Sequence, residues 1–263
     1  MILLVAGTSE TAPLANAMLR AGHKVLVSLA TEVDLELAHD PALTVRRGRL
    51  DKAGLQELIT RHAITQVVDA SHPFAQALHR ELKDVCAHLG IQRIRYERPE
   101  TDLGPGVEVL ENHEAAAASA VRYCKPILLT TGSRNLVPYV NAAAHANIPL
   151  YARVLPATES ELACRLAGFD ESRIEFARGP FSVDQTRALL RRWHVGVLIA
   201  KNGGIASGLA ERLEAARLEG VVALIVRRPD QESGAAGSFT EVMERLGVPN
   251  PERGHAGVHT DVL

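Results

Sequence analysis

Aromatic residues, cysteines and long hydrophobic runs are all scarce in this chain of 263 residues. Phe, Trp and Tyr together make up 4% of it, too few for a protein that reads nucleic acid by stacking bases on rings. No apolar run approaches the roughly 18 residues that a membrane-spanning helix needs. The apolar start, Met1–Ala6, lacks a basic leader and turns polar at Thr8, so it predicts a buried strand and not a signal sequence.

Charge of neither sign dominates the chain. Lys and Arg number 29 against 31 Asp and Glu, a formal net charge of −2, so the whole molecule is not drawn to nucleic acid or to an anionic membrane. The three cysteines, Cys86, Cys124 and Cys164, are widely spaced and form no C-x-x-C pair. They predict reduced thiols packed as small apolar side chains, and therefore a cytoplasmic protein.

Several catalytic motifs are absent. The sequence has no G-x-x-x-x-G-K-[ST] loop, no H-E-x-x-H, no G-x-S-x-G and no Tyr followed four residues later by Lys. These absences exclude the usual active sites of P-loop NTPases, zinc metalloproteases, serine hydrolases and short-chain dehydrogenases. His255 and His259 have i, i+4 spacing but lie in a polar tail without a neighbouring carboxylate or cysteine, so we predict no metal site.

What the sequence does contain is an alternation of short apolar runs with amphipathic stretches, which is typical of strand–helix units that build a parallel sheet. Helices are expected over Thr11–Arg20 and in a core-facing stretch that ends at Gly90. The segment Glu97–Val107 carries two prolines and two glycines and predicts a linker between domains at 1–100 and 101–263. Strands are expected at Ile2–Ala6, from Val25, and at Thr44–Arg46, Gln66–Asp69, Arg93–Tyr96, Ile127–Thr130, Pro149–Val154, Ile174–Ala177, Val195–Ala200 and Val221–Val226.

In doubly wound sheets ligands bind beyond the carboxyl ends of the strands, so the residues at which the apolar runs stop are the site candidates. The first stop, Gly7–Glu10, lacks the G-x-G-x-x-G fingerprint. Thr8 and Ser9 suit a phosphate at a helix start, and an ordinary turn with a helix cap explains them equally well. Ser28 stands where NAD enzymes place an acidic residue. A 2′-phosphate or a solvated face would each suit the arginines that follow the third strand, Arg46, Arg47 and Arg49.

Later stops are Asp69–Phe74, Thr130–Ser133 and Lys201–Gly204. His72, which precedes Pro73, fits a structural helix start, and it also fits a ligand contact or proton donor. The residues alone leave both interpretations open.

Taken in order, these stops resemble the precorrin-6A reductase family of cobalamin biosynthesis, and the resemblance spans nearly the whole chain. Its most specific element is Asp-Ala-Ser-His-Pro-Phe-Ala at 69–75. Two departures are visible: Ser71 replaces the usual Thr and keeps the hydroxyl, while Gly203 replaces the usual Ser and loses it. The matching stretches are Gly7–Glu10, Val27–Thr31, Gly48–Asp51, Asp69–Ala75, Arg95–Pro99, Leu129–Ser133, Arg153–Pro156, Gly179–Ser182 and Lys201–Gly204.

The resemblance implies an α/β fold of two Rossmann-like, doubly wound domains with mainly parallel sheets and a cleft between them. It implies an enzyme that uses NADPH, with NADH possible, to reduce one double bond of the tetrapyrrole precorrin-6A, or of its cobalt form, to the 6B compound. Cofactor contacts are then expected in the first domain from Gly7, Thr8, Ser9, Ser28, Arg47, Arg49, Ala70, Ser71, His72, Pro73 and Phe74.

The same resemblance implies a ligand with many carboxylates, which arginine and lysine recognise through charge-assisted hydrogen bonds. A proton must also reach the reduced ring, from His72, from Lys201 or from solvent. Substrate contacts are expected from Arg95, Arg98, Thr131, Gly132, Ser133, Arg134, Arg153, Arg178, Lys201, Asn202 and Gly203.

Two other interpretations stay open at this stage. One is an unrelated NAD(P)-binding reductase or epimerase, and the other is a non-catalytic sensor that binds a nucleotide or a tetrapyrrole. The presence of cobalt in the substrate, the choice between NADPH and NADH, and the exchange of a strand between the sheets are open as well. We expect a monomer or a weak homo-oligomer.

Overall fold

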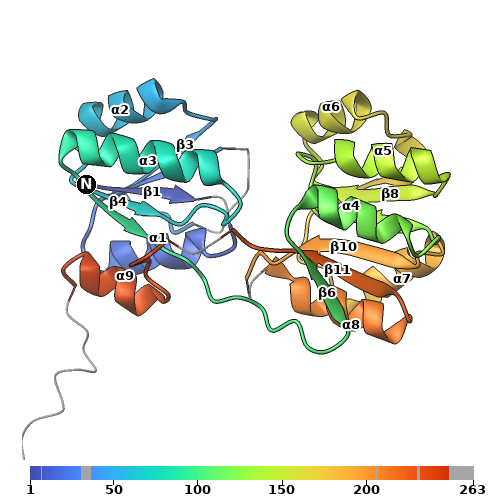
Figure 1. Cartoon of the computed structure of the whole chain (residues 1–263). Helices are drawn as coiled ribbons and strands as arrows, with labels where there is room; N and C mark the ends of the chain where they lie inside the picture. The colour runs from blue at the N-terminus through green and yellow to red at the C-terminus, as the bar shows by residue number, and fades with distance from the viewer. Residues whose placement is uncertain (7, 31–36, 205–206, 230–231, 249–263) are drawn as a thin grey trace, which may run out of the picture. The chain divides into compact units, whose positions relative to one another are not determined.

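The computed structural model describes residues 1–6, 8–30, 37–204, 207–229 and 232–248. The chain divides into two compact units, Met1–Pro99 with Pro229–Leu263, and Glu100–Arg228. Each unit contains a parallel β-sheet covered by helices on both faces (Figure 1). The two parallel α/β units that the sequence predicts are therefore confirmed.

The first unit has a five-stranded sheet in the order β3-β2-β1-β4-β5. Helices α2 (Lys52–Arg61) and α3 (Gln76–Leu89) cover one face, and α1 (Thr11–Arg20) and α9 (Phe239–Arg245) cover the other (Figure 1). The strands are β1 (Ile2–Ala6), β2 (Val25–Leu29), β3 (Leu43–Arg47), β4 (Gln66–Asp69) and β5 (Gln92–Arg95).

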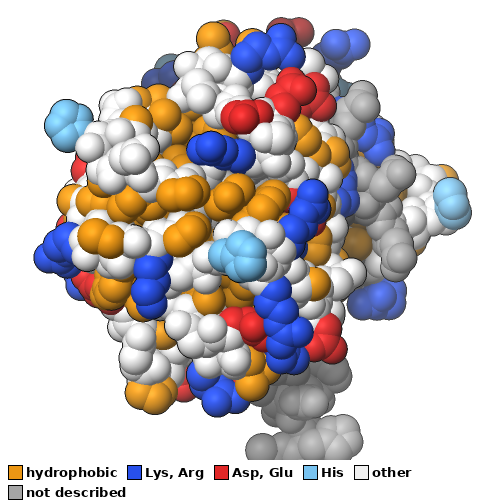
Figure 2. All heavy atoms as spheres, turned by 90° about the vertical axis from the view of Figure 1, so that its right-hand side faces the viewer, with side chains coloured by type: hydrophobic (Ala, Val, Ile, Leu, Met, Phe, Trp, Pro, Cys, Tyr) orange, Lys and Arg blue, Asp and Glu red, His pale blue; other side chains and the backbone are white. Residues whose placement is uncertain are grey.

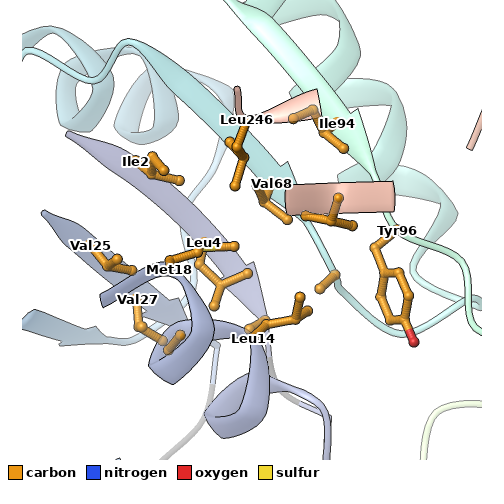
Figure 3. Packing of buried hydrophobic residues seen from close by; sticks show 14 of the residues in the cluster. Ile2, Leu4, Leu14, Met18, Val25, Val27, Val68, Ile94, Tyr96 and Leu246 are labelled. Atoms are coloured by element: carbon orange, nitrogen blue, oxygen red, sulfur yellow. The ribbon is translucent and has the colours of Figure 1, made fainter. Parts of the chain in front are cut away.

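The core of this unit explains why its central strands are continuous apolar runs. Successive side chains of a strand point to opposite faces, and here both faces are buried. Leu4 belongs to the cluster that contains Leu14 and Met18 of α1 (Figure 3), whereas Leu3 belongs to the cluster with Leu55 of α2. Each fully buried side chain of this size contributes about 1.5–3 kcal/mol, so the strand is fixed from both sides.

The second unit has a six-stranded sheet in the order β6-β11-β10-β7-β8-β9. Helices α4 (His113–Val121), α5 (Val137–Ala146) and α6 (Thr158–Leu166) cover one face, and α7 (Val183–Arg192) and α8 (Leu209–Leu218) cover the other (Figure 1). Its strands are β6 (Val107–Leu110), β7 (Ile127–Leu129), β8 (Leu150–Val154), β9 (Ile174–Phe176), β10 (Val197–Lys201) and β11 (Val222–Val226).

The connection between the sheets differs from a simple succession of two domains. Strand β6 follows β5 in the chain but pairs with β11 in the second sheet. In return, Ala236 forms a parallel bridge with Tyr96, beyond the end of β5. Val242 of α9, and Leu246 directly after α9, belong to the first core. The second unit therefore ends at Arg228, whereas the sequence analysis placed all of 101–263 in the second domain. The local sequence pattern could not predict that the chain returns to the first unit, because the return is visible only in the pairing of distant segments.

Charged side chains of both signs lie among hydrophobic ones on the face that Figure 2 shows. This mixture agrees with the nearly balanced charge of the sequence. In the part of the chain that the structure describes, no helix is long and apolar enough to cross a membrane. The tail from Pro249 to Leu263, which the sequence analysis expects at the surface, lies outside the described residues.

Candidate functional site

Each sheet has one topological switch point. In the first sheet β1 and β4 are neighbours and lead to α1 and α3, which cover opposite faces. In the second sheet β7 and β10 are neighbours and lead to α5 and α8, again on opposite faces. Ligands of doubly wound folds bind beyond the carboxyl ends of the strands at such points. Each unit therefore has its own candidate site, formed by the loops after β1 and β4 in the first unit and by the loops after β7 and β10 in the second.

The loop after β1 forms a compact turn at the start of α1. Thr8 N–H donates to Thr11 Oγ1 at 3.2 Å, and the Thr11 hydroxyl donates to Thr8 O at 2.7 Å. Ser9 is exposed and its hydroxyl donates to Glu10 Oε2 at 3.0 Å. The first amides of a helix have no intrahelical acceptor, so this end of α1 suits an anion. Gly7 lies outside the described residues.

At the end of β2, one of the three arginines noted in the sequence contacts Ser28. Ser28 and Arg46 are paired in register on β2 and β3, and Arg46 Nη1 donates to Ser28 Oγ at 3.0 Å. Burial lowers the pKa of Arg46. Arg47 and Arg49 are exposed. Because the group at the end of the second strand meets the ribose in such folds, Arg46 is better placed than Arg47 or Arg49.

Asp69, the last residue of β4, has a fully buried carboxylate held by two arginines of β5. It accepts from Arg93 Nη2 at 2.8 Å, from Arg95 Nη1 at 3.1 Å and from the Ser71 hydroxyl at 2.6 Å. Burial by itself would raise the pKa of Asp69, but Arg95, His79 and Arg93 outweigh it and hold that pKa below its usual range. This network fixes the shape of the loop that follows β4.

Two arginines that were expected to contact the substrate form ion pairs within the first unit instead. Arg95 is buried and donates to Asp69 O at 3.0 Å and Ser71 O at 3.1 Å, in addition to its ion pair with the Asp69 carboxylate. Arg98 is buried as well, with Nη1 2.9 Å from Glu10 Oε1. Both guanidinium groups form ion pairs inside the first unit, although Arg95 Nη2 is buried and has no hydrogen-bond partner among the described residues, so we assign both arginines mainly to its structure.

Ser71 links Asp69 to His79, a residue that no motif or spacing in the sequence singles out. The Ser71 hydroxyl gives its one proton to Asp69, so it accepts from His79 Nε2 at 3.0 Å. Burial lowers the pKa of His79 and outweighs the attraction of Asp69. A neutral His79 ring with its proton on Nε2 can donate to Ser71 Oγ while the Ser71 hydroxyl donates to Asp69.

The rest of this loop is arranged around His72. His72 is exposed, and its Nδ1 accepts from Phe74 N–H at 3.3 Å. The two rings lie 5.7 Å apart. Ala70 and Pro73 are buried, while Phe74 is half-buried. The contacts of His72 shape the turn before α3, as a structural helix start requires.

In the second unit, Lys201 lies at the end of β10 and is half-buried. Burial, and then the charge of Arg134, lowers its pKa to about 8. Burial and the charge of Lys201 lower the pKa of His113 to about 4. The neutral His113 ring lies between Tyr139 Oη, 2.7 Å from Nδ1, and Asn135 Nδ2, 3.0 Å from Nε2. Lys201 is thus protonated at neutral pH and releases its proton more readily than an ordinary lysine.

The loop after β10 is held by Asn202, which is 3% exposed. Its Oδ1 accepts from Thr101 N at 3.3 Å and from Gly204 N at 3.2 Å. Gly203 is buried, and its N–H donates to Lys201 O at 2.9 Å. The carboxamide oxygen of Asn202 is therefore engaged in folding the loop.

The loop after β7 collects the other predicted residues. Gly132 has φ 79°, a left-handed conformation that favours glycine. Ser133 Oγ donates to Ser160 Oγ at 3.3 Å, and Arg134 is exposed. Thr131 is buried, with a hydroxyl that has no hydrogen-bond partner among the described residues.

Arg153, on β8, forms an ion pair with Glu175 of β9. The centroid of the Phe181 ring lies 3.9 Å from Arg153 Cζ. Arg178, in the loop between β9 and Phe181, is exposed. The sequence analysis did not select two cationic or titratable residues of the second unit, His113 near Lys201 and Arg212 near Arg153. Neither has a spacing that distinguishes it from an ordinary helix residue.

A metal centre is not indicated. Within the described ranges, no group of three or more His, Cys, Asp or Glu side chains is arranged to hold an ion. His255 and His259 lie outside those ranges.

Two doubly wound parallel units, with hydroxyl, glycine and cationic residues at their switch points, define an α/β protein of the Rossmann class. The family model described as "Precorrin-6x reductase CbiJ/CobK" matches residues 1–247. The chain belongs to this precorrin-6x reductase family and is an oxidoreductase. As a reductase it requires a reducing cofactor of the nicotinamide type.

Individual relatives agree with this assignment. The chain is 32% identical to a cobalt-precorrin-6A reductase of Priestia megaterium, over 94% of this chain and 98% of that protein. It is 29% identical to a precorrin-6A reductase of Rhodobacter capsulatus, over 87% and 88%. Among solved structures, the CobK precorrin-6A reductase matches with TM-score 0.77 at 26% identity, over 94% and 96%. The similarity therefore extends over both units.

Proposed function

We propose that this chain reduces one carbon–carbon double bond of precorrin-6A, or of its cobalt form, to the 6B compound with NADPH. The observation that carries the proposal is family membership over both units, joined to cations at the second switch point that suit an acidic substrate. The test is oxidation of NADPH that depends on added precorrin-6A, with the cobalt form in a parallel assay. Binding without turnover would favour the sensor instead.

The first unit is the proposed cofactor domain. When bound, NADPH supplies the hydride. The start of α1, with Thr8 and Ser9, would bind the pyrophosphate, and Ser28 with Arg46 would bind the 2′-phosphate of the ribose. The loop 70–74 would lie beside the nicotinamide ribose, since it follows β4, the neighbour of β1. These residues fit the group because hydroxyl, amide and guanidinium donors converge where the fold places its phosphates.

Replacing Arg46 by Gln is expected to weaken NADP⁺ binding by about 10- to 100-fold, because a charge-assisted hydrogen bond to phosphate contributes about 1.5–3 kcal/mol. The binding of NAD⁺, which lacks that phosphate, should stay nearly unchanged. Isothermal titration of both nucleotides measures the difference. Arg61→Gln, at the exposed last turn of α2, is the control for loss of one positive charge. Equal weakening of both nucleotides would contradict the assignment of the 2′-phosphate to Arg46.

The second unit is the proposed substrate domain, in which cations bind carboxylates of the macrocycle. Arg134 and Arg178 are exposed, and Lys201 is half-buried at the switch point. Arg134→Ala is expected to raise the KM for the tetrapyrrole by about tenfold and to leave NADP⁺ binding nearly unchanged. Steady-state kinetics together with nucleotide titration measure both. Loss of NADP⁺ affinity with an unchanged KM would reverse the roles of the two units.

Lys201 is the proposed proton donor to the carbon next to the one that accepts the hydride. A base with a pKa near 8 carries its proton at neutral pH and transfers it readily. His72 is exposed, and its Nδ1 is engaged with Phe74 N–H in shaping its own turn. Of the two candidates in the sequence, the half-buried lysine has the environment suited to general acid catalysis.

A further inference from the structure

Arg212 is a cation in the first turns of α8 that the sequence analysis did not select. Its Nε donates to Gly208 O at 3.0 Å and its Nη2 to Ser207 O at 2.9 Å. Its Nη1 lies 3.3 Å from both Thr130 O and Thr130 Oγ1. All of these acceptors are neutral, and no ion pair of Arg212 occurs among the described residues. Its positive charge is therefore not balanced by a contacting carboxylate.

Arg153 brings a second positive charge to the same place. Leu129 of β7 pairs with Ala152 of β8, so the residues that follow, Thr130 and Arg153, are neighbours at the ends of these strands. Burial, and then the charge of Arg153, lowers the pKa of Arg212 to about 10. Glu175 is the ion-pair partner of Arg153, whereas Glu211, whose charge acts to raise the pKa of Arg212, forms no ion pair with Arg212 among the described residues.

Unpartnered polar atoms accompany this charge. Arg153 Nη1, Thr131 Oγ1 and Ser207 Oγ are buried and have no hydrogen-bond partner in the described part of the chain. Arg153 and Thr131 are each only 7% exposed. Buried donors without acceptors are costly and therefore rare in native proteins, and a cluster of them beside a cation indicates a place for an oxyanion.

We propose that Arg212, Arg153 and Thr131 form an oxyanion subsite of the second unit and that this subsite takes one carboxylate of the tetrapyrrole substrate. This inference rests on the proposed function and adds a residue and a contact set to it. The Phe181 ring now lies on Arg153, and the carboxylate would take its place. A hydrogen bond to a carboxylate is stronger than a cation–π contact, so the exchange is favourable.

A phosphate of the cofactor has the same oxyanion chemistry, so the experiment measures the two ligands separately. The KM and kcat for precorrin-6A, the dissociation constant of precorrin-6A without cofactor, and that of NADP⁺ are determined for each variant. Urea unfolding of each variant reports its stability. The variants are Thr131→Val, Arg212→Gln and Arg212→Lys, and the controls are Thr186→Val and Arg187→Gln.

The control substitutions change the same residue types as the variants, but at positions outside the proposed subsite. Thr186 of α7 also has a fully buried hydroxyl without a partner, and Arg187 of the same helix pairs with Glu219. Thr131→Val and Thr186→Val should both keep or raise the stability, because each removes a buried unpartnered donor. Thr131→Val alone should raise the KM for precorrin-6A, by roughly threefold to tenfold.

Arg212→Gln is expected to raise that KM by about 10- to 100-fold with little change in kcat or in NADP⁺ binding. Arg212→Lys should recover most of the affinity, because it keeps the positive charge, although it loses the guanidinium contacts with the four oxygens of Gly208, Ser207 and Thr130. If Arg212→Lys and Arg212→Gln both lower the stability and neither changes the KM, Arg212 only stabilises the start of α8 and the inference is overturned. A rise confined to the NADP⁺ dissociation constant would also overturn it, in favour of a cofactor phosphate.

Failure of the inference is distinguishable from failure of the proposed function. A wild-type enzyme that turns over precorrin-6A, with variants unchanged in KM, refutes the subsite alone. A wild-type protein that binds precorrin-6A without oxidising NADPH refutes the reductase proposal, and the precorrin-6A dissociation constants of the variants then decide the subsite.

Discussion

Lys201→Met is expected to lower kcat by about 100-fold or more while leaving NADP⁺ binding nearly unchanged. General acid catalysis by a positioned group contributes roughly 10²- to 10⁴-fold, and methionine keeps the apolar stem but has no proton to give. Lys201 is half-buried at the switch point of the second sheet, whose cations we assign to the substrate. Single-turnover kinetics at saturating NADPH separate this effect from substrate binding.

The pH dependence gives the same assignment an independent readout. Burial and Arg134 lower the pKa of Lys201 to about 8, so the acid form is present below that pH and is lost above it. The kcat of the wild-type enzyme should therefore fall as the pH rises through about 8. Lys201→Arg should lower kcat and remove this descending limb, since a guanidinium does not release its proton in this range.

Lys125→Met is the matched control, because Lys125 is exposed and precedes β7, at the opposite edge of the same sheet. Its kcat and pH profile should equal those of the wild type. A near-normal kcat for Lys201→Met, or a descending limb that persists in that variant, would show that the proton comes from another source such as solvent.

Asp69→Asn is expected to lower the free energy of unfolding of the first unit by about 3–5 kcal/mol. The substitution keeps the size of the side chain but removes the charge that Arg93 and Arg95 share at 2.8 and 3.1 Å. Removing one partner of a buried ion pair typically costs this much, and here it leaves Arg93 with Glu232 and Arg95 with Glu97 as their remaining carboxylates. Peptide-resolved hydrogen exchange over β4 and β5 measures it within this unit.

The sign of the pH effect follows from the lowered pKa of Asp69. A carboxyl whose pKa is lower in the folded state contributes stability in full above its ordinary pKa of about 4, and loses it as the pH falls through the lowered value. Asp69→Asn should therefore flatten the acid limb of the stability profile. Asp84→Asn, which removes an exposed carboxylate of α3, should change the stability little. A similar loss in both variants would contradict the role of the buried network.

The strands and their ends could be predicted because burial on both faces leaves a direct trace in the sequence. The runs Ile2–Ala6 and Gln66–Asp69 match β1 and β4 residue for residue, and Gly90, with φ 66°, ends α3 as its position suggested. The carboxyl ends of parallel strands gather at one edge, so listing where the runs stop also located both switch points.

Pairing between distant segments could not be predicted in the same way. Strand β6 is four residues long and begins at the end of the Pro- and Gly-rich stretch, so its pattern merges with a linker. The bridge of Ala236 to Tyr96 depends on the return of the chain to the first sheet, for which no local periodicity exists.

Side-chain roles were hidden for a related reason. Arg95 stands at a strand end, as a substrate ligand would, but its partner Asp69 is 26 residues away on the neighbouring strand. Arg212 looks like a surface residue of an amphipathic helix, and only its carbonyl contacts reveal where it lies. A sequence gives the type of a charged group, whereas its partners decide between a structural and a ligand role.

The central claim is that this chain transfers hydride from a nicotinamide cofactor to a tetrapyrrole. It is tested most directly with NADPH that carries deuterium at the transferable position of its reduced ring, incubated with the enzyme and precorrin-6A in ordinary water. Mass spectrometry should find a product that has gained one deuterium and one hydrogen, formed in step with the oxidation of NADPH. A macrocycle that is bound but returned unchanged, or reduced without deuterium, would contradict the claim.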